Sequence, residues 1–214
     1  NRVLVDHAAD HLFAPTAEAA DQLRTEAIPD RRIEVTGNTV VDAVRQHEQL
    51  AREKSDVLAE LALQAEPFAL LTAHRPGNVD DPERFQGLLD GVARYADDRG
   101  LPVVYPVHPR SREKLEEFGL AVPDAIDCVE PLNFLDFLRL ESEAAVAFTD
   151  SGGVQEETCV LGTPCVTVRE STERPETVTA GSNVLAEPNP ESIRDAAEAV
   201  RRGPNDWEAP FGDG

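Results

Sequence analysis

Short apolar segments alternate with helical patterns along most of this chain, at intervals too long for β-hairpins. Such an alternation is typical of βαβ units, in which consecutive strands run parallel and a helix covers each connection. The segments show little polar alternation, as expected of strands that are buried on both faces. We therefore predict an α/β fold built on parallel sheets. The strand candidates are residues 9–14, 33–36, 68–72, 103–107, 125–129, 144–149, 165–168 and 183–185.

Capping residues mark two of the helices. Asp81 is a favoured N-cap, Pro82 suits the first helical position, and apolar residues then recur at helical spacing until Gly100. Asn189 and Pro190 repeat this arrangement before a second helix. The first helix lies between two strand candidates, as a βαβ order requires.

The strand candidates fall into two groups. Residues 39–63 between the groups are charged, only weakly apolar and without a strand signal, which predicts a helical connection. We therefore expect four parts. They are residues 1–38, the remnant of a first domain; 39–67, the connection; 68–203, a nearly complete second domain with six strand candidates; and 204–214, a truncated tail.

The composition is that of a soluble globular protein. Its 214 residues are 41% hydrophobic and contain no apolar run of membrane-spanning length, so we expect no membrane partner. With 41 acidic against 20 basic residues, the formal net charge of -21 argues against nucleic-acid binding. A merely soluble acidic surface explains part of this excess. The remainder favours a halophilic, salt-rich cytoplasm, where ions screen the self-repulsion.

Cysteines and isolated histidines give no sign of a metal or cofactor site. The cysteines fit neither a disulfide framework nor a C-x-x-C clip, and we read all three as small buried apolar residues: Cys128, Cys159 and Cys165. Three histidines without ligand spacing are interpreted as structural or surface residues: His7, His11 and His47. The chain has no methionine and begins at Asn1, which indicates a processed chain or, more readily, a fragment.

The stretch TDSGGVQEE (149–157) has the pattern of an anion site. An apolar segment leads into a turn that opens a helix: Ser151, Gly152 and Gly153. Glycines let a ligand approach the backbone closely, and the unpaired amides of a first helical turn carry partial positive charge suited to a phosphate. Glu157 follows one turn later and could accept hydrogen bonds from sugar hydroxyls, whereas Glu156 is interpreted as a solvated surface residue. The alternative is a tight turn packed for structural reasons.

Downstream, Arg174 in the sequence TERPE (172–176) offers a guanidinium that can fork onto a phosphate. The alternative for Arg174 is a surface ion pair with the acids around it, from Glu170 to Glu176.

Together these two segments resemble the UDP-N-acetylglucosamine 2-epimerase family, whose members carry SGG-V-Q-E-E followed at this distance by T-E-R-P-E. The resemblance extends along the whole chain through HLFAPT (11–16), VTGNTVVD (35–42), TAHR (72–75), VHP (107–109) and PLNFLDF (131–137). It implies two facing doubly wound domains in the GT-B arrangement, the first only partly present, with the nucleotide between them. It also implies missing segments at both ends and, at full length, a homodimer.

The resemblance implies a UDP-sugar substrate. The diphosphate would lie on the Ser-Gly-Gly turn, with Glu157 as the ribose anchor and Arg174 beside the phosphate where negative charge develops. His74, at the end of a strand, would be a catalytic residue that contacts the diphosphate; its alternative is a satisfied polar residue. Phe137 would stack on uracil; its alternative is a place on an apolar helix face with Phe134.

A possible second role is implied for two further residues. Arg75 and His108 match positions through which some bacterial relatives bind an activating substrate molecule. Here, however, residues 74–78 read HRPGN where the common bacterial pattern is HRREN.

The family inverts C2 of UDP-N-acetylglucosamine, giving UDP-N-acetylmannosamine, by elimination and re-addition of UDP through 2-acetamidoglucal. The carboxylates that move the C2 proton come from the first domain in relatives. We therefore expect this chain to hold the half of the site that binds UDP, and to be inactive alone. Two alternatives stay open. A GT-B glycosyltransferase would share the fold but need an acceptor pocket, and a UDP-binding remnant would have no activity.

Overall fold

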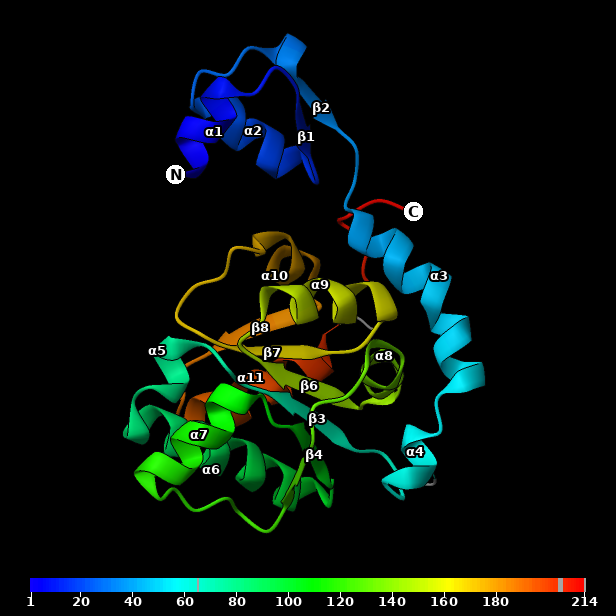
Figure 1. Cartoon of the computed structure of the whole chain (residues 1–214), viewed down its shortest axis with the longest axis vertical. Helices are drawn as coiled ribbons and strands as arrows, with labels where there is room; N and C mark the ends of the chain where they lie inside the picture. Colours follow the sequence, from blue (N-terminus) through cyan, green and yellow to red (C-terminus); the bar gives the residue numbers. More distant parts are fainter. Residues whose placement is uncertain (65, 204–205, 214) are drawn as a thin grey trace.

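The computed structural model describes residues 1–64, 66–203 and 206–213, and in it helices alternate with parallel strands (Figure 1). The elements up to the connection are α1 (Arg2–Ala8), β1 (Leu12–Ala14), α2 (Ala17–Thr25), the 3-10 turn η1 (Asp30–Arg32), β2 (Ile33–Val35), α3 (Thr39–Lys54) and α4 (Val57–Glu60). Those that follow are β3 (Ala69–Thr72), α5 (Pro76–Val79), α6 (Pro82–Arg99), β4 (Val103–Pro106), α7 (Pro109–Phe118), β5 (Ile126–Val129), α8 (Phe134–Glu143), β6 (Val146–Thr149), α9 (Gly152–Leu161), β7 (Cys165–Val168), α10 (Pro175–Ala180), β8 (Asn183–Ala186) and α11 (Pro190–Arg202).

All eight strand candidates form strands, and the α/β prediction is confirmed. The first is shorter than expected, because Ala9 ends α1 instead of opening β1. Segment 39–63 is helical as predicted, although it forms two helices, α3 and α4.

The larger sheet has the strand order β5-β4-β3-β6-β7-β8, and each pair of neighbours runs parallel. From β3 the chain continues to β4 and β5 on one side of that strand. It then crosses to β6 on the other side and continues to β7 and β8. Strand order therefore reverses between β3 and β6. In open parallel sheets, ligands bind at the carboxyl ends of the strands beside such a reversal.

Both faces of this sheet are covered, as its apolar strands require. Leu71 packs on one face with Phe85 of α6 and Ile193 of α11. Its neighbour Leu70 points to the opposite face and packs with Leu140 of α8. The sheet is therefore doubly wound, and its core fixes the strand ends that carry the candidate site.

One cysteine departs from the sequence prediction. Cys159 and Cys165 are buried, but Cys128 is only partly buried. Cys128 lies on β5, which is an edge strand of the six-stranded sheet and has a neighbour on one side.

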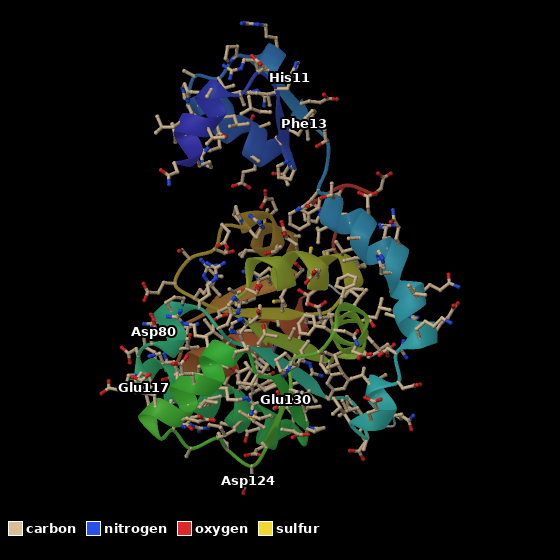
Figure 2. The ribbon with its side chains drawn as sticks, viewed as in Figure 1. His11, Phe13, Asp80, Glu117, Asp124 and Glu130 are labelled. Atoms are coloured by element: carbon tan, nitrogen blue, oxygen red, sulfur yellow. The ribbon has the colours of Figure 1, made fainter. Side chains whose placement is uncertain are left out.

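Residues 1–36 form a separate small unit with its own parallel pair, β1 and β2, drawn in blue in Figure 1. Leu12, Leu23 and Ile28 form its core. Figure 2 places His11 and Phe13 in this unit, away from the larger sheet, and Phe13 is 68% exposed.

Several contacts join the small unit and the connection to the remainder, among them apolar packing of α3 on α8 and the following two hydrogen bonds. Thr16 Oγ1 donates to a Glu176 carboxylate oxygen at 2.5 Å, and the Asn38 amide donates to the Phe211 carbonyl at 2.9 Å. Of the predicted tail, residues 204, 205 and 214 lie outside the described residues, whereas Phe211 packs between Val41 and Cys159. Within the described ranges, no helix combines the length and apolar character needed to cross a membrane.

Candidate functional site

Asp150, directly after β6, is the most connected polar side chain at the strand reversal. Its buried carboxylate accepts hydrogen bonds from the His74 and Arg75 amides at 3.1 and 2.9 Å and from Asn78 Nδ2 at 3.2 Å. His74 Nδ1 lies 3.3 Å from the same carboxylate. Asp150 thus ties the turn after β3 to the turn before α9. No role was predicted for Asp150 from the sequence, although a carboxylate directly after a buried strand was a visible signal.

The Ser-Gly-Gly turn opens α9, as predicted. Ser151 is the N-cap with extended backbone, and no side chain caps the helix. Gly152 is buried and Gly153 is exposed. The first turn of α9 therefore presents its positive end at the reversal point of the sheet, an arrangement that suits an anion.

Glu173 lies against this turn. A Cβ added to Gly152 would stand 2.7 Å from Glu173 Oε1, so a glycine is what leaves room for the carboxylate. Glu173 forms ion pairs with Arg75 at 2.7 Å and with Arg169 at 2.6 Å. Burial opposes ionisation of Glu173, but its backbone hydrogen bond and the two arginines lower its pKa. Arg75 is therefore held close to the turn by a shared carboxylate.

Arg174 is paired with an acid from α9, not with the acids of its own segment. Its Nε lies 2.6 Å from Glu156 Oε1, although the N–H does not point along that line. Glu156 also accepts from Asn38 Nδ2 at 2.7 Å. The interpretation of Glu156 as a solvated surface residue was wrong, because these partners cover it to 7% exposure. Burial raises the pKa of Glu156 although both partners lower it.

Gln155 attaches the TERPE segment to α9. Its buried side chain accepts from Thr172 Oγ1 at 2.5 Å and from Asn183 Nδ2 at 3.2 Å. The Arg174 amide in turn donates to Thr172 Oγ1 at 2.9 Å. A direct hydrogen bond therefore joins the TDSGGVQEE and TERPE segments.

A hollow of about 210 Å³ lies beside the turn. It is lined by Thr72, Ala73, His74, Pro106, His108, Pro131, Leu132, Phe137, Ser151 and Val154. The His74 and His108 rings are 5.4 Å apart between centroids. Phe137 borders the hollow and also packs on the apolar cluster around Leu70, so both of its predicted environments are present.

The structure brings His74, His108, Phe137 and Ser151 together at this hollow, with Gly152 next in the chain. Arg75 borders a second, adjoining hollow of about 570 Å³, together with Arg84 and Arg169. Gly153 follows Gly152 in the first turn of α9, and the two remaining predicted residues, Glu157 and Arg174, do not line either hollow.

Glu157 is half-buried and faces Glu141 of α8, and Arg174 lies on Glu156. In the described part of the chain, no group of three His, Cys, Asp or Glu side chains is arranged to hold a metal.

The model of the UDP-N-acetylglucosamine 2-epimerase family matches residues 1–214. The chain belongs to this family. Among curated relatives, it is 41% identical to the UDP-N-acetylglucosamine 2-epimerase of Methanococcus maripaludis and 40% identical to that of Methanocaldococcus jannaschii. Each match covers 100% of this chain and 60% of the relative. The chain thus spans about three fifths of the length of these epimerases.

Solved epimerase structures share its fold. The M. jannaschii enzyme in complex with UDP-GlcNAc and UDP superposes with a TM-score of 0.91 at 40% identity, over 99% of this chain and 60% of that one. The Neisseria meningitidis enzyme bound to UDP-GlcNAc gives 0.83 at 29% identity, over 100% and 60%. The chain therefore has the GT-B-like α/β architecture of these epimerases.

Proposed function

We propose that this chain is the part of a UDP-N-acetylglucosamine 2-epimerase that binds UDP. The enzyme would interconvert UDP-GlcNAc and UDP-ManNAc through elimination and re-addition of UDP. The carrying observation is the uncapped, glycine-opened start of α9, which lies at the strand reversal beside the hollow of His74 and Phe137. The relatives crystallised with UDP-GlcNAc support the choice of ligand.

In this proposal the diphosphate lies on the Ser151, Gly152 and Gly153 turn. Departure of UDP leaves negative charge on the β-phosphate, and the first-turn amides of α9 are fixed dipoles aimed at that charge. No solvent reorganisation is needed when the bond breaks, because the β3 and β6 ends already hold the turn through Asp150.

Uracil would pack on Phe137 and the ribose hydroxyls would meet the Glu157 carboxylate. Phe137 borders the hollow, and Glu157 follows Val154, another lining residue, by one helical turn. A flat aromatic ring beside a carboxylate suits a nucleoside, whose base is apolar on its faces and whose sugar offers two hydroxyl donors.

His74 and Arg174 would act on the leaving group. His74 borders the hollow and is oriented by Asp150 at 3.3 Å. Arg174 is paired with Glu156 through Nε at 2.6 Å, and its terminal nitrogens would turn toward a phosphate oxygen when the substrate enters. A bidentate guanidinium there stabilises the β-phosphate of departed UDP, which carries two negative charges, more than the same phosphate in the UDP-sugar, which carries one.

Residues 68–203 would be the UDP-binding domain, with 1–38 belonging to the facing domain that supplies the proton-handling carboxylates. The full-length enzyme would be a homodimer in a salt-rich cytoplasm, as the net charge of -21 favours.

Hydrogen exchange at C2 of UDP-GlcNAc in deuterated water, followed by NMR, tests whether UDP binding and proton transfer belong to different domains. The 214-residue chain should bind UDP weakly and give no exchange, because a positioned acid and base contribute about 10²–10⁴-fold in rate. A chain extended at both ends to the length of the relatives is the positive control and should exchange. Comparable exchange by both chains would place the catalytic carboxylates within residues 1–214 and overturn the division.

A further inference from the structure

Two glutamates meet one helical turn beyond the hollow. Glu141 follows Phe137 by four residues on α8, and Glu157 follows Val154 by three residues on α9. Residues spaced by three or four lie on one face of a helix, so each glutamate continues the face that lines the hollow. The side chains of Glu141 and Glu157 lie close enough across the two packed helices for each to shift the pKa of the other.

Glu141 has the surroundings of a core residue. It is 1% exposed, and its Oε1 is buried with no hydrogen-bond partner. Leu138 and Leu140 beside it on α8 pack against apolar residues of α3 and α4. A buried carboxylate in such a position is costly unless it is neutralised.

In the part of the chain that the structure describes, the charged groups near the pair do not include a cation that neutralises it. Arg139 on α8 is paired with Glu143 at 3.0 Å. From β7 the Cys165 thiol lies near enough for the Glu141 charge to raise its pKa, and along α9 the Glu157 charge reaches Glu156. Among the described residues, no arginine or lysine is a cause of the pKa shift of either glutamate.

A single proton between the Glu141 and Glu157 carboxyl groups removes the cost of burying two negative charges side by side. Burial first, and then the charge of Glu157, raises the pKa of Glu141 well above its ordinary value of 4.5. Burial also raises the pKa of Glu157, but the hydrogen bond from Glu141 lowers it. The more buried Glu141 therefore keeps the proton, and the half-exposed Glu157 keeps the charge.

We propose that Glu141 is a positioning residue for the nucleotide: its protonated carboxyl donates a hydrogen bond to Glu157 and holds that carboxylate toward the ribose. The proposal rests on the assignment of Glu157 as the ribose anchor. A carboxylate has lone pairs enough for the Glu141 donor and for two ribose hydroxyls at once. Fixing its rotamer before binding removes an ordering cost from the binding step.

Two substitutions separate positioning from packing. Glu141→Gln keeps a donor of the same shape that cannot ionise, whereas Glu141→Leu fills the buried position without a donor. Calorimetric titration with UDP at neutral pH should show affinity within about twofold of wild type for Glu141→Gln. Glu141→Leu should bind about tenfold more weakly, the effect of one positioned hydrogen bond to a charged group. Circular dichroism checks that each variant is folded.

The infrared spectrum gives a readout that does not depend on the nucleotide. At neutral pH the wild-type chain should show the carbonyl band of a protonated carboxylic acid, and Glu141→Gln should lack it. A missing band in the wild type would overturn the shared proton. Equal UDP affinity of wild type and Glu141→Leu would overturn the positioning role, as would equal weakness of both variants.

The result for Glu157→Gln separates this proposal from the proposed function. If Glu157→Gln binds UDP as wild type does, the ribose assignment fails and the positioning role fails with it, while the infrared band still reports the carboxyl pair. If Glu157→Gln weakens binding and Glu141→Leu does not, the positioning role alone is wrong.

Discussion

Individual side chains at the end of β6 make the candidate site a single connected unit. Asp150 holds the turn that carries His74 and Arg75, and Gln155 holds the segment that carries Arg174. Both are buried polar residues that form hydrogen bonds to backbone or side chains from distant parts of the chain. Such bonds fix geometry, because an unmade bond in a buried place is expensive.

Sequence reasoning placed the Ser-Gly-Gly turn at the start of a helix, and α9 begins there. The roles of Arg174 and His74 came from the resemblance to the epimerase family and stay predictions. Sequence reasoning missed the partner of Arg174, since Glu156 and Arg174 meet only after α9 and the TERPE segment have packed together. It also missed Glu141. A glutamate four residues after Phe137 lies on the apolar face of the predicted helix, and a charged residue on such a face is unusual.

Glu157→Gln should weaken UDP binding by about 1.5–3 kcal/mol, the scale of a charge-assisted hydrogen bond. Glutamine keeps the shape of the side chain but offers one acceptor oxygen without charge. Isothermal titration calorimetry measures the change. Glu143→Gln, an exposed charge removal on α8, is the matched control and should leave affinity as it is. Unchanged affinity for Glu157→Gln would refute its assignment to the ribose.

Stability should depend on pH through Glu141. Above pH 4.5 the unfolded chain releases a proton that the folded protein retains, because the folded pKa is raised. The free energy of unfolding should therefore fall as pH rises, by about 1.4 kcal/mol per pH unit while Glu141 stays protonated in the fold.

Urea unfolding between about pH 5 and 8 tests this dependence. Glu141→Gln should have the shallower slope, since it removes one such proton, while the general acidic repulsion acts on both proteins. Parallel stability curves for the two proteins would show that Glu141 does not retain a proton on folding.

At the scale of elements, the local patterns were sufficient for the strands and for the capped helices. Asp81 accepts from the Glu83 and Arg84 amides, and Asn189 accepts from the Ser192 amide, as their N-cap positions predicted. Strand order could not be predicted from the sequence, because it depends on which strands pair once the crossover connections have formed. The close approach of α6 to the start of α11 is one such tertiary result.

Gly87 allows that approach, and Gly87→Ala should disrupt it. A Cβ at this position would collide with the Pro188 carbonyl oxygen, a backbone atom that cannot turn aside. We expect a loss of about 2 kcal/mol in the free energy of unfolding, within the usual range for overpacking. Gly77→Ala is the control, because a Cβ there meets no atom within 4 Å. Equal stability of the two variants in urea unfolding would contradict this account of the packing.

At the scale of the whole molecule, the acidic surface and the separation of the two units dominate. Asp80, Glu117 and Asp124 lie on the outer edge of the larger unit in Figure 2. Several acids are paired, as Asp80 is with Arg110 at 2.5 Å, but 41 acidic residues outnumber the 20 basic ones. The excess could be read from composition, whereas the contacts across the units, such as Thr16 with Glu176, could not.

Salt should stabilise this protein. With a net charge of -21, like charges on the folded protein repel one another in dilute buffer. At about 1 M salt this repulsion is screened beyond a few ångströms. Thermal melts in sodium chloride, from about 0.1 to 2 M, should show a rising midpoint. Chloride is preferable to sulfate, which stabilises proteins by exclusion from their surface. A midpoint indifferent to chloride would remove the argument for a salt-rich setting.

The central claim is that the start of α9, beside the hollow of His74 and Phe137, binds the UDP part of the substrate. Titration of the ¹⁵N-labelled chain with UDP, followed by amide NMR spectra, tests this claim most directly. The largest saturable shifts should fall on the amides of Ser151, Gly152 and Gly153, with smaller ones around Phe137. Absence of saturable shifts, or shifts confined to residues away from the start of α9, would contradict it.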